Sequence, residues 1–578
     1  MFQIYFSRED LTVQAEPQAN LLEVMRKAGL HPDAPCGGHG KCGKCKVGIR
    51  TAEQSEPQTV LACQVQVESD LIVDSMLSGK GYSILTEGVQ MATTFDPIVR
   101  QVQIEVEPCI KGESTSDWSR LILALQKEGL LLDGPAPEPD PEIASQAGPL
   151  QRSTGGRMWA LVSGKNILAV SADKMEYYLA AFDIGTTTVV GYLLDGNTGE
   201  AVTVTSRLNP QAEYGGDVIN RANYSLEHGT EQVTGCIRQA IREMLAELAQ
   251  KAGIDAGKIA GVSIAGNTCM HHLFMGISVD SLVHAPYNPA VSEPMIRRAA
   301  DYQFGIHPKA PIFMLPNIAG FVGADTVACL VSTDLAEVKD WTLLIDIGTN
   351  GEMVLARDHE MIACSTAAGP AFEGAGITHG MRGSEGAISK VRWAEDHWDY
   401  EVVGGTKPRG ICGSGLLDLV SELLLSGQMD EMGELQTEEP RIILADKDES
   451  STGAPVTLEQ KDVRQLQLAK AAIAAGVHLL AESRNIDVTD ISEVWLAGAF
   501  GSFMSPESAC NIGLIPPELR GRIKAIGNAA GEGAKRVLLE RSAWDKAAYL
   551  AAECDFLELA TIAEFQDRYV DELEFPEL

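Results

Sequence analysis

The chain contains 578 residues, of which 45% are hydrophobic and 22% charged, and its formal net charge at pH 7 is −34. This length exceeds one hydrophobic core, so we expect three or four domains of a soluble globular protein. The acidic balance argues against nucleic acid, whose phosphates bind Lys and Arg, and no apolar run reaches the roughly 18 residues of a membrane helix. The start MFQIYFSRED lacks the basic and apolar regions of a secretion signal, which predicts a cytoplasmic protein.

Residues 1–86 contain the densest group of cysteines. Cys36, Cys42, Cys45 and Cys63 follow the spacing C-x5-C-x2-C-x17-C, and glycines between the first three let the backbone turn tightly. Four thiolates spaced in this way suit a [2Fe-2S] cluster. Zinc also takes four thiolates, but zinc sites usually pair C-x2-C with a second close pair, whereas Cys63 stands alone. We therefore expect an iron-sulfur cluster, with zinc as the competing interpretation.

The elements around these cysteines follow one another as in a small electron carrier. The sequence predicts a strand hairpin within residues 2–15, a helix over residues 20–29 with Asn20 as its N-cap, and strands at residues 46–50 and 70–76. This order resembles the β-grasp fold of plant-type and adrenodoxin-type ferredoxins.

Four basic side chains lie close to the cysteines of this otherwise acidic chain: Lys41, Lys44, Lys46 and Arg50. Two interpretations remain open. Their positive charge either balances the negative charge of the cluster or forms a docking rim for an acidic partner.

A connector and a small module follow the cysteine domain. Residues 87–96 show no sustained periodicity, so we expect a linker that lets the cluster domain swing. Within residues 97–177 the sequence predicts a strand, an amphipathic helix with Ser and Asp in capping position, an exposed proline-rich loop over residues 133–149, and a hairpin that turns at Gly164-Lys165. Nothing in this α+β module supplies chemistry, so we interpret it as a spacer or docking unit.

Residues 178–578 contain an internal duplication. An apolar strand runs into Asp183-Ile184-Gly185-Thr186-Thr187-Thr188, and a second runs into Asp346-Ile347-Gly348-Thr349-Asn350-Gly351. Glycine in such a turn lets backbone N–H groups approach phosphate, the threonines add donors, and each Asp can hold Mg2+ through its water shell. One such turn would be weak evidence. Two copies, each followed by an apolar strand that ends in Ala-Gly, are much stronger.

The later elements complete this pattern. The two apolar strands end at Ala265-Gly266 and Ala497-Gly498, and the second leads into glycines and phenylalanines that could lie against an adenine ring. A helix with Asp325 near its N-terminus is predicted before the second turn. The order of phosphate turn, connecting helix, phosphate turn and adenosine motif resembles the superfamily of acetate and sugar kinases, heat-shock chaperone ATPases and actin. Asp325 is compatible with the connecting-helix residue that positions water or metal in that superfamily, and its role stays open.

A glycine turn opens an amphipathic helix in the second half. Gly413, Ser414 and Gly415 suit either a nucleotide phosphate or ribose, or the close packing of a helix on a sheet. Cys412 in this turn could be a nucleophile, but no His stands at a telling position nearby, so a structural thiol is the preferred interpretation.

Three further stretches carry no assigned chemistry. Residues 209–225 are polar and glycine-rich before a helix, and their spacing gives them no task. His271 and His272 are expected as core or surface side chains rather than a metal pair. The acidic stretch 565–578 is expected to be a solvated end.

The complete arrangement resembles the reductive activators of corrinoid proteins. The resemblance covers essentially the whole chain and rests on the cysteine loop and on AFDIGTTTVVGYLL, NPQAEYGGDV, VSIAGNT, GFVGADTVA, LLIDIGTNGE, GPAFEGAGI and LAGAFG. It implies ATP-dependent, one-electron reduction of Co(II) to Co(I) in a corrinoid protein by way of the [2Fe-2S] cluster, within a corrinoid-dependent methyl-transfer or O-demethylase system of an anaerobe. The implied partners are that corrinoid protein and an upstream low-potential electron donor, and a homodimer stays open.

Two other functions remain as alternatives. One is a redox-regulated small-molecule kinase of the actin-like superfamily, and the other is a non-catalytic electron-transfer protein. An activator of radical dehydratases is disfavoured, because such proteins are expected to bridge a [4Fe-4S] cluster between two subunits whereas four cysteines lie within this chain.

The sequence therefore predicts a multidomain α/β and α+β protein with [2Fe-2S], ATP and Mg2+ as its cofactors. Its expected parts are a ferredoxin-like domain (1–86), a linker (87–96), a middle domain (97–177) and a duplicated actin-like ATPase fold (178–340 and 341–578). The expected catalytic residues are Asp183, Asp325 and Asp346, the cluster ligands are Cys36, Cys42, Cys45 and Cys63, and the nucleotide-binding residues are Gly185, Thr186, Thr187, Thr188, Gly348, Thr349, Asn350, Gly413, Ser414, Gly415, Gly498 and Gly501.

Overall fold

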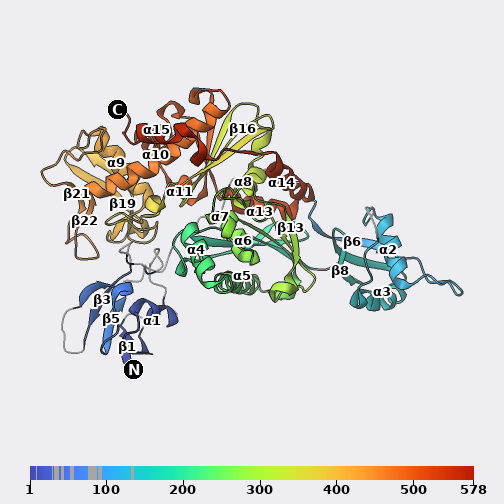
Figure 1. The fold of residues 1–578 in the computed structure, drawn as a ribbon. Helices are drawn as coiled ribbons and strands as arrows, with labels where there is room; N and C mark the ends of the chain where they lie inside the picture. Colours follow the sequence, from blue (N-terminus) through green and yellow to red (C-terminus); the bar gives the residue numbers. More distant parts are fainter. Residues whose placement is uncertain are drawn as a thin grey trace.

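The computed structural model describes residues 1–7, 10–28, 30, 38, 40, 45–51, 57–75, 88, 94–131 and 136–578. These residues form a ferredoxin-like domain, a small three-stranded module and two large halves, each built on a six-stranded sheet (Figure 1). The ferredoxin-like domain and the three-stranded module lie at opposite ends of the molecule. Among the helices of these residues, none is both long enough and apolar enough to cross a membrane.

The N-terminal domain is a five-stranded sheet in the order β2-β1-β5-β3-β4, packed against one helix. Its elements are β1 (Phe2–Phe6), β2 (Leu11–Ala15), α1 (Leu21–Lys27), β3 (Lys46–Arg50), β4 (Gln58–Leu61) and β5 (Leu71–Ser75). β1 and β2 form the expected hairpin, and β1 pairs in parallel with β5. Asn20 caps α1, since its side chain accepts a hydrogen bond from the N–H of Leu22. The hairpin, the helix and the two later strands are confirmed, whereas β4 was not predicted.

The three-stranded module contains β6 (Val99–Glu105), α2 (Asp117–Lys127), α3 (Pro141–Thr154), β7 (Arg157–Ser163) and β8 (Asn166–Ser171). The predicted strand, the predicted capped helix and the hairpin at Gly164-Lys165 are confirmed. The expectation of an exposed loop over residues 133–149 is wrong in part, because α3 begins at Pro141. Asp140 accepts hydrogen bonds from the N–H groups of Glu142 and Ile143. Pro141 suits the first helical position, because it has no N–H that would be left without a partner there.

The first half of the duplicated region is a sheet in the order β11-β10-β9-β12-β14-β13. Its elements are β9 (Tyr178–Ile184), β10 (Thr188–Asp195), β11 (Ala201–Leu208), α4 (Val218–His228), α5 (Glu231–Ala252), β12 (Ile259–Gly266), α6 (Thr268–Met275), α7 (Asp280–Val283), β13 (Met295–Arg298), β14 (Pro311–Met314) and α8 (Ala324–Thr333). Side chains of β9 alternate between two cores: Phe182 packs with α5 and α6, whereas Leu179 and Ala181 pack with α8. Burial on both faces explains the continuous apolar run before Asp183.

The second half repeats this sheet in the order β24-β23-β15-β16-β17-β25. Its elements are β15 (Thr342–Ile347), β16 (Gly351–Arg357), β17 (Glu360–Thr366), α9 (Gly413–Leu425), α10 (Gln460–Ser483), β23 (Glu493–Ala497), α11 (Gly498–Phe503), α12 (Pro506–Asn511), β24 (Ile523–Gly527), α13 (Ala529–Leu539), α14 (Arg541–Glu553), β25 (Asp555–Phe556) and α15 (Ala563–Asp571). In both halves the first strand joins two antiparallel neighbours on one side and parallel strands on the other. This shared order confirms the internal duplication.

Two helices, α8 and α13, lie against each other in the core between the sheets. The core around them includes Leu179 from β9 and Leu344 from β15, so it belongs to both halves. Their close approach depends on Gly533, because a Cβ there would lie 1.9 Å from the carbonyl oxygen of Ala328. The helix predicted to carry Asp325 is α8, and α13 is its counterpart in the second half.

Insertions and the C-terminal segment complete the second half. Small sheets form from β18 (Ala387–Ala394), β19 (His397–Val402) and β20 (Gly410–Ile411), and from β21 (Arg441–Ala445) and β22 (Val456–Glu459). The expectation of a solvated C-terminal end is wrong in part: no residue of α15 is buried, but α15 packs on α10 and Phe575 is buried. Lys470 of α10 donates a hydrogen bond to the carbonyl of Glu574 and lies over the Phe575 ring. These contacts fix the end of the chain despite its acidic composition.

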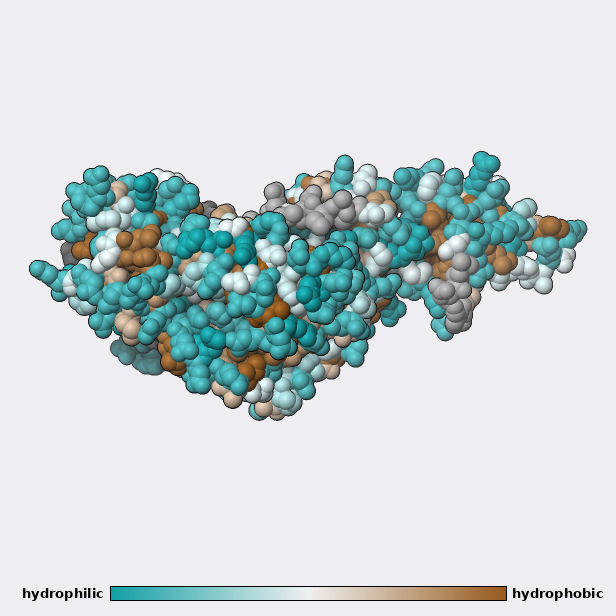
Figure 2. Space-filling view, turned by 90° about the horizontal axis from the view of Figure 1, so that it is seen from above, coloured by the Kyte–Doolittle hydropathy of each residue, from teal (hydrophilic) through white to brown (hydrophobic). Residues whose placement is uncertain are grey.

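The surface seen in Figure 2 is mostly hydrophilic, and its apolar side chains appear in small, separate groups. Such scattered apolar residues are ordinary for a globular protein.

Candidate nucleotide site and cluster loop

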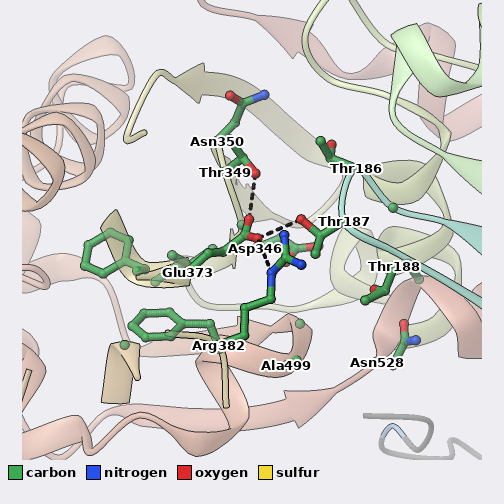
Figure 3. A pocket seen from close by; sticks show the side chains of 18 of the residues that line it. Thr186, Thr187, Thr188, Asp346, Thr349, Asn350, Glu373, Arg382, Ala499 and Asn528 are labelled. Carbon is green, nitrogen blue, oxygen red and sulfur yellow. Dashed lines mark hydrogen bonds and ion pairs between the residues drawn. The ribbon is translucent and has the colours of Figure 1, made fainter. Parts of the chain in front are cut away.

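The two duplicated turns face a shared cavity of about 310 Å³ between the halves. In the first turn, the Gly185 N–H donates to the Thr188 carbonyl over 2.9 Å, and in the second, the Gly348 N–H donates to the Asn350 carbonyl over 2.8 Å. Both hairpins therefore end in a tight loop, which covers residues 185–188 in the first and residues 348–350 in the second, and their threonines line the cavity (Figure 3).

Four carboxyl groups gather at the floor of this cavity: Asp183, Asp325, Asp346 and Glu352. Burial, with the neighbouring Asp346, raises the pKa of Asp183 to about 7 and that of Asp325 to about 7. Burial raises the pKa of Asp346 to about 6, and burial with Asp325 and Asp346 holds that of Glu352 well above its ordinary value. Among the described residues no three acidic side chains lie close enough together to ligate one metal ion directly, so a divalent cation at this cluster would be held through its water shell.

The partner of each Asp across its hairpin differs between the halves. Asp183 of β9 lies opposite Val190, whereas Asp346 of β15 lies opposite Glu352. The second turn therefore carries an additional acid that the first lacks. Glu352 is the last residue of the motif LLIDIGTNGE, and the sequence pattern alone assigns it no role.

Residues 209–225 brace the first turn from behind. The Asn209 amide donates to the Gly185 carbonyl over 2.8 Å, and its backbone N–H donates to the Thr187 carbonyl over 2.9 Å. Arg221 is fully buried and donates to the carbonyls of Thr186 and Gly215 over 2.5 and 2.8 Å. Burial lowers the pKa of Arg221 to about 10, which leaves its guanidinium charged. A segment without a predicted task thus places a positive charge behind the turn.

A glutamate from a glycine-rich loop lies between the two turns. Glu373 accepts hydrogen bonds from the Thr187 and Thr349 hydroxyls, each over 2.7 Å, and forms an ion pair with Arg382 over 3.7 Å (Figure 3). Glu373 belongs to the motif GPAFEGAGI, to which the sequence pattern assigns no catalytic role, and Arg382 follows five residues after that motif ends. The one sequence signal for these two residues is that an acidic and a basic side chain stand in a glycine-rich loop.

Aromatic rings and helix N-termini form the other side of the cavity. Phe372 and Phe500 stack with their ring centroids 4.9 Å apart, and Phe503 is 55% exposed at the edge. α9 begins here with no side chain capping its first N–H groups, which therefore remain available to a ligand. Cys412, just before α9, is buried and contacts the Ile388 carbonyl and the Ser414 hydroxyl.

Gly498 is fitted to the floor of the cavity. Its φ of +79° favours glycine, and a Cβ there would lie 2.6 Å from a carboxyl oxygen of Asp346. Asn528, which caps α13 and forms a hydrogen bond with Asp183, approaches the same floor. The duplication could have identified Asn528, because α13 is the counterpart of α8.

Most of the predicted nucleotide residues line this one cavity. They are Asp183, Asp325 and Asp346, with Gly185, Thr186, Thr187, Thr188, Gly348, Thr349, Asn350, Gly413, Ser414 and Gly498. Gly415 and Gly501 lie outside that set and serve packing instead: a Cβ on Gly415 would meet the Ile388 carbonyl, and one on Gly501 would meet Leu496. His271 and His272 are buried side chains of α6, as expected for core residues.

The described part of the cysteine loop brings two predicted ligands together. Cys45 is buried at the start of β3, Cys63 lies in a short turn of helix, and the Cys45 carbonyl accepts the N–H of Ala62. The Asn20 amide donates to the Cys63 carbonyl over 2.8 Å, so the cap of α1 also fixes this turn. Cys36, Cys42, Lys41, Lys44 and Gly29 lie outside the described residues.

Fold and site together define a class: a nucleotide-binding protein of the actin-like superfamily that carries its own ferredoxin domain. Residues 4–68 match the model of the 2Fe-2S iron-sulfur cluster binding domain, residues 178–338 that of the RACo middle region, and residues 340–578 that of the C-terminal domain of RACo, the ASKHA domain. The residues called the middle region are thus the first half of the duplicated fold.

Similar proteins extend this assignment to the whole chain. The corrinoid activation enzyme RamQ of Eubacterium limosum is 32% identical over 97% of this chain and 97% of its own. The [Co(II) methylated amine-specific corrinoid protein] reductase of Methanosarcina barkeri is 26% identical over 69% of this chain and 77% of its own. A solved structure described as a reductive activator for corrinoid, iron-sulfur protein matches with a TM-score of 0.76 and 30% identity, covering 100% of this chain and 98% of that one. The chain belongs to the family of reductive activators of corrinoid proteins, as the sequence resemblance predicted.

Proposed function

We propose that this protein uses ATP to drive the one-electron reduction of Co(II) to Co(I) in a corrinoid protein. The observation that carries the proposal is the cavity between two phosphate-type turns on the same chain as a ferredoxin domain, in a member of this family. The resulting Co(I) would be the nucleophile of a methyl-transfer or O-demethylase system.

Four cysteines would hold the [2Fe-2S] cluster: Cys36, Cys42, Cys45 and Cys63. The donor set supports this assignment, because Cys45 and Cys63 lie on neighbouring segments joined by a backbone hydrogen bond. The cluster supplies storage for one electron. The protein's part is to seat it and to present it to a partner, and the exposed Lys46 on β3 suits a partner with acidic side chains.

ATP would bind between the halves with its phosphates at the two turns. The threonine hydroxyls and backbone N–H groups of the turns would donate to the phosphates, and α9 would offer further N–H groups. The carboxyl cluster of Asp183, Asp325, Asp346 and Glu352 would hold Mg2+ and its water shell. Phe500 and Phe503 would lie against the adenine.

The energetics explain why an ATP site would accompany a ferredoxin domain. A plant-type donor lies near about −400 mV, and Co(I) is a stronger reductant. If the gap were about 0.2 V, the transfer would cost about 4.6 kcal/mol, somewhat over three powers of ten at about 59 mV each. A nucleotide-dependent change worth a few kcal/mol would offset this cost, for example by favouring a complex in which a Co(II) ligand has been removed.

Contacts of the connector give a physical route between the nucleotide site and the cluster domain. The connector meets both ends of α13: the Gly88 N–H donates to Glu532, in the first turn of α13, over 3.2 Å, and the Asp96 N–H donates to the carbonyl of Leu539, the last residue of α13, over 2.9 Å. The first of these contacts lies next to Asn528, which caps α13 at the cavity floor. A rearrangement of that floor would therefore reach the connector.

An upstream low-potential donor, a cytoplasmic location and a homodimer belong to the same proposal as expectations of the family.

The test is anaerobic and uses the full, cluster-loaded chain. Reduced protein, MgATP and a corrinoid protein are mixed, and the Co(I) absorption band is followed. Asp183→Asn and Asp346→Asn are expected to abolish the ATP-dependent part of Co(I) formation, whereas Asp396→Asn, at a carboxylate that is 92% exposed, is the matched control. ATP-dependent Co(I) formation that survives both cavity variants with the cluster intact would rule the proposal out.

A further inference from the structure

Glu373 links the two halves of the nucleotide fold through a single carboxylate. One oxygen accepts from the Thr187 hydroxyl of the first half and the other from the Thr349 hydroxyl of the second, both over 2.7 Å. These hydroxyls belong to the turns that face the shared cavity. An anionic oxygen group that accepts from both turns at once has the chemistry of a phosphate placed between them.

The loop that carries Glu373 also brings Arg382 beside it. Gly374 has a φ of +78°, and a Cβ there would lie 2.4 Å from the backbone nitrogen of Met381, so the chain folds back on itself between the two residues. The Met381 N–H donates to the Ile411 carbonyl and ties this fold to β20. Glu373 and Arg382 therefore form one unit on one loop, and Figure 3 shows both side chains directed toward the turns.

The charges around the cavity set the problem that a polyphosphate meets on entry. The acidic side chains that line it are Asp183, Asp325, Asp346, Glu352 and Glu373, and Arg382 is the one basic side chain among the described lining residues. Mg2+ would offset the acids at the floor. Glu373 lies instead at the threonine hydroxyls, where it would repel any phosphate that needs the same donors.

We propose that Glu373 occupies a phosphate position between the two turns, and that nucleotide phosphate displaces it, taking over the two threonine hydroxyls and the guanidinium of Arg382. This inference rests on the proposed nucleotide site and names two further residues in it. The exchange conserves interactions: two O–H donors and one cation leave a carboxylate and engage a phosphate. The direct link between the halves breaks, and the ligand becomes the bridge.

This exchange makes closure of the cleft depend on what lies between the turns. In this arrangement the Glu373 carboxylate joins the halves through the hydroxyls of Thr187 and Thr349. With nucleotide, the loop of residues 369–386 is released from the turns and the phosphates bridge them. The loop leads into β18 and is hydrogen-bonded to β20, so its release would transmit phosphate binding to both strands.

The test measures affinities of the full chain for adenosine, MgADP and the non-hydrolysable MgAMPPNP by titration calorimetry. Glu373→Gln keeps the size but removes the charge, so MgAMPPNP should bind about tenfold tighter. Arg382→Ala should weaken MgAMPPNP binding by about tenfold or more, and Arg382→Lys should restore part of the loss. Adenosine, which lacks phosphates, should bind all of these variants as it binds the wild type.

Matched controls come from the same region. Glu385→Gln alters an exposed acid of the same loop and Arg392→Ala an exposed base of β18, and neither residue lines the cavity. Unchanged or weaker MgAMPPNP binding by Glu373→Gln would overturn the inference, as would equal losses for adenosine and MgAMPPNP in Arg382→Ala. A wild type that binds none of the three ligands would instead overturn the proposed function, and the inference with it.

Discussion

The two turns of the nucleotide site join similar pairs of antiparallel strands, but they lie in different environments. The first is held from behind by Asn209 and by the buried Arg221, and Asp183 has an apolar neighbour across its hairpin. The second has Glu352 in the equivalent position, beside Asp346. The two hairpins of the duplication therefore differ both in their own residues and in the segments that contact them.

This difference assigns different tasks to the halves. A turn whose carbonyls are tied to a buried guanidinium is fixed before any ligand arrives. A turn with an additional acid, approached by the Glu373 loop, presents charges that a metal or a phosphate must rearrange. We therefore expect the first turn to act as the rigid anchor and the second to be the side that responds to nucleotide.

The largest expected effect comes from removing the brace of the first turn. Arg221→Met leaves the carbonyls of Thr186 and Gly215 without their buried donor, which should lower the free energy of unfolding by about 3 kcal/mol. Urea unfolding and MgAMPPNP titration measure the two consequences, since nucleotide binding should be lost as well. Arg298→Ala, at a side chain that is 76% exposed, is the control and should change neither. A variant of Arg221 with normal stability and normal binding would show that the first turn needs no brace.

A smaller effect is expected at the floor beneath the second turn. Gly498→Ala introduces a Cβ that collides with the Asp346 carboxylate, so Mg-nucleotide affinity should fall by about tenfold or more. Gly521→Ala is the matched control, because Gly521 has a φ of +78° but no atom within 4 Å of its added Cβ. Both variants should lose about 1 kcal/mol of stability through backbone strain. Equal nucleotide affinities in the two variants would show that the cavity floor at Gly498 does not contribute to nucleotide binding.

The carboxyl cluster predicts a pH dependence. The pKa values of Asp183 and Asp325, about 7, and of Asp346, about 6, are raised from the ordinary 3.8, so the empty site binds more protons than the unfolded chain between about pH 4 and pH 7. These groups therefore stabilise the empty protein at low pH, and that contribution is lost as the pH rises through 6 to 7. A bound divalent cation offsets the ionised charges, so Mg-nucleotide should bind more tightly as the pH rises over the same range, with proton release.

Calorimetry in buffers of different ionisation enthalpy counts the released protons. We expect about one or more at pH 6.5 and fewer at pH 8. Nucleotide binding without proton release at pH 6.5 would mean that the cluster is already ionised in the empty cleft, and the contrast between the two turns would then need another cause.

The smallest effect is expected at the rim of the ferredoxin domain. Lys46→Glu, together with Arg50→Glu, should slow cobalt reduction several-fold at low ionic strength without altering the cluster's absorption spectrum. Lys127→Glu, on the three-stranded module at the opposite end of the molecule, is the control. If the rate is unmoved in all variants, these basic residues only balance the charge of the cluster.

The sequence predicted the fold where local patterns carry the signal. The duplicated Asp-Gly-Thr hairpins, the helix with Asp325 and the capped helices of the first two domains follow from periodicity and capping, and they form as expected. The acidic composition of residues 565–578 does not reveal the burial of Phe575, because that burial depends on a distant helix. The prolines of residues 133–149 indicate a loop, but proline is compatible with a first helical turn, and α3 begins at Pro141.

The site was predicted only where its residues belong to the hairpins. Glu373 and Arg382 meet the turns through a loop whose course no local pattern reveals, and Arg221 acts through carbonyls of a turn far away in the sequence. Their roles depend on tertiary contacts that periodicity does not encode. Asn528 is different, because it caps α13, and the internal duplication predicts that α13 lies at the same cavity as its counterpart α8.

The central claim is that nucleotide in this cavity supplies the free energy for cobalt reduction. The most direct measurement is the equilibrium fraction of Co(I) in a corrinoid protein mixed with the fully reduced chain at a fixed donor potential, with and without MgATP. The account predicts that MgATP raises the Co(I) fraction by orders of magnitude, and that MgADP does not. A Co(I) fraction that is equal with and without MgATP would contradict it.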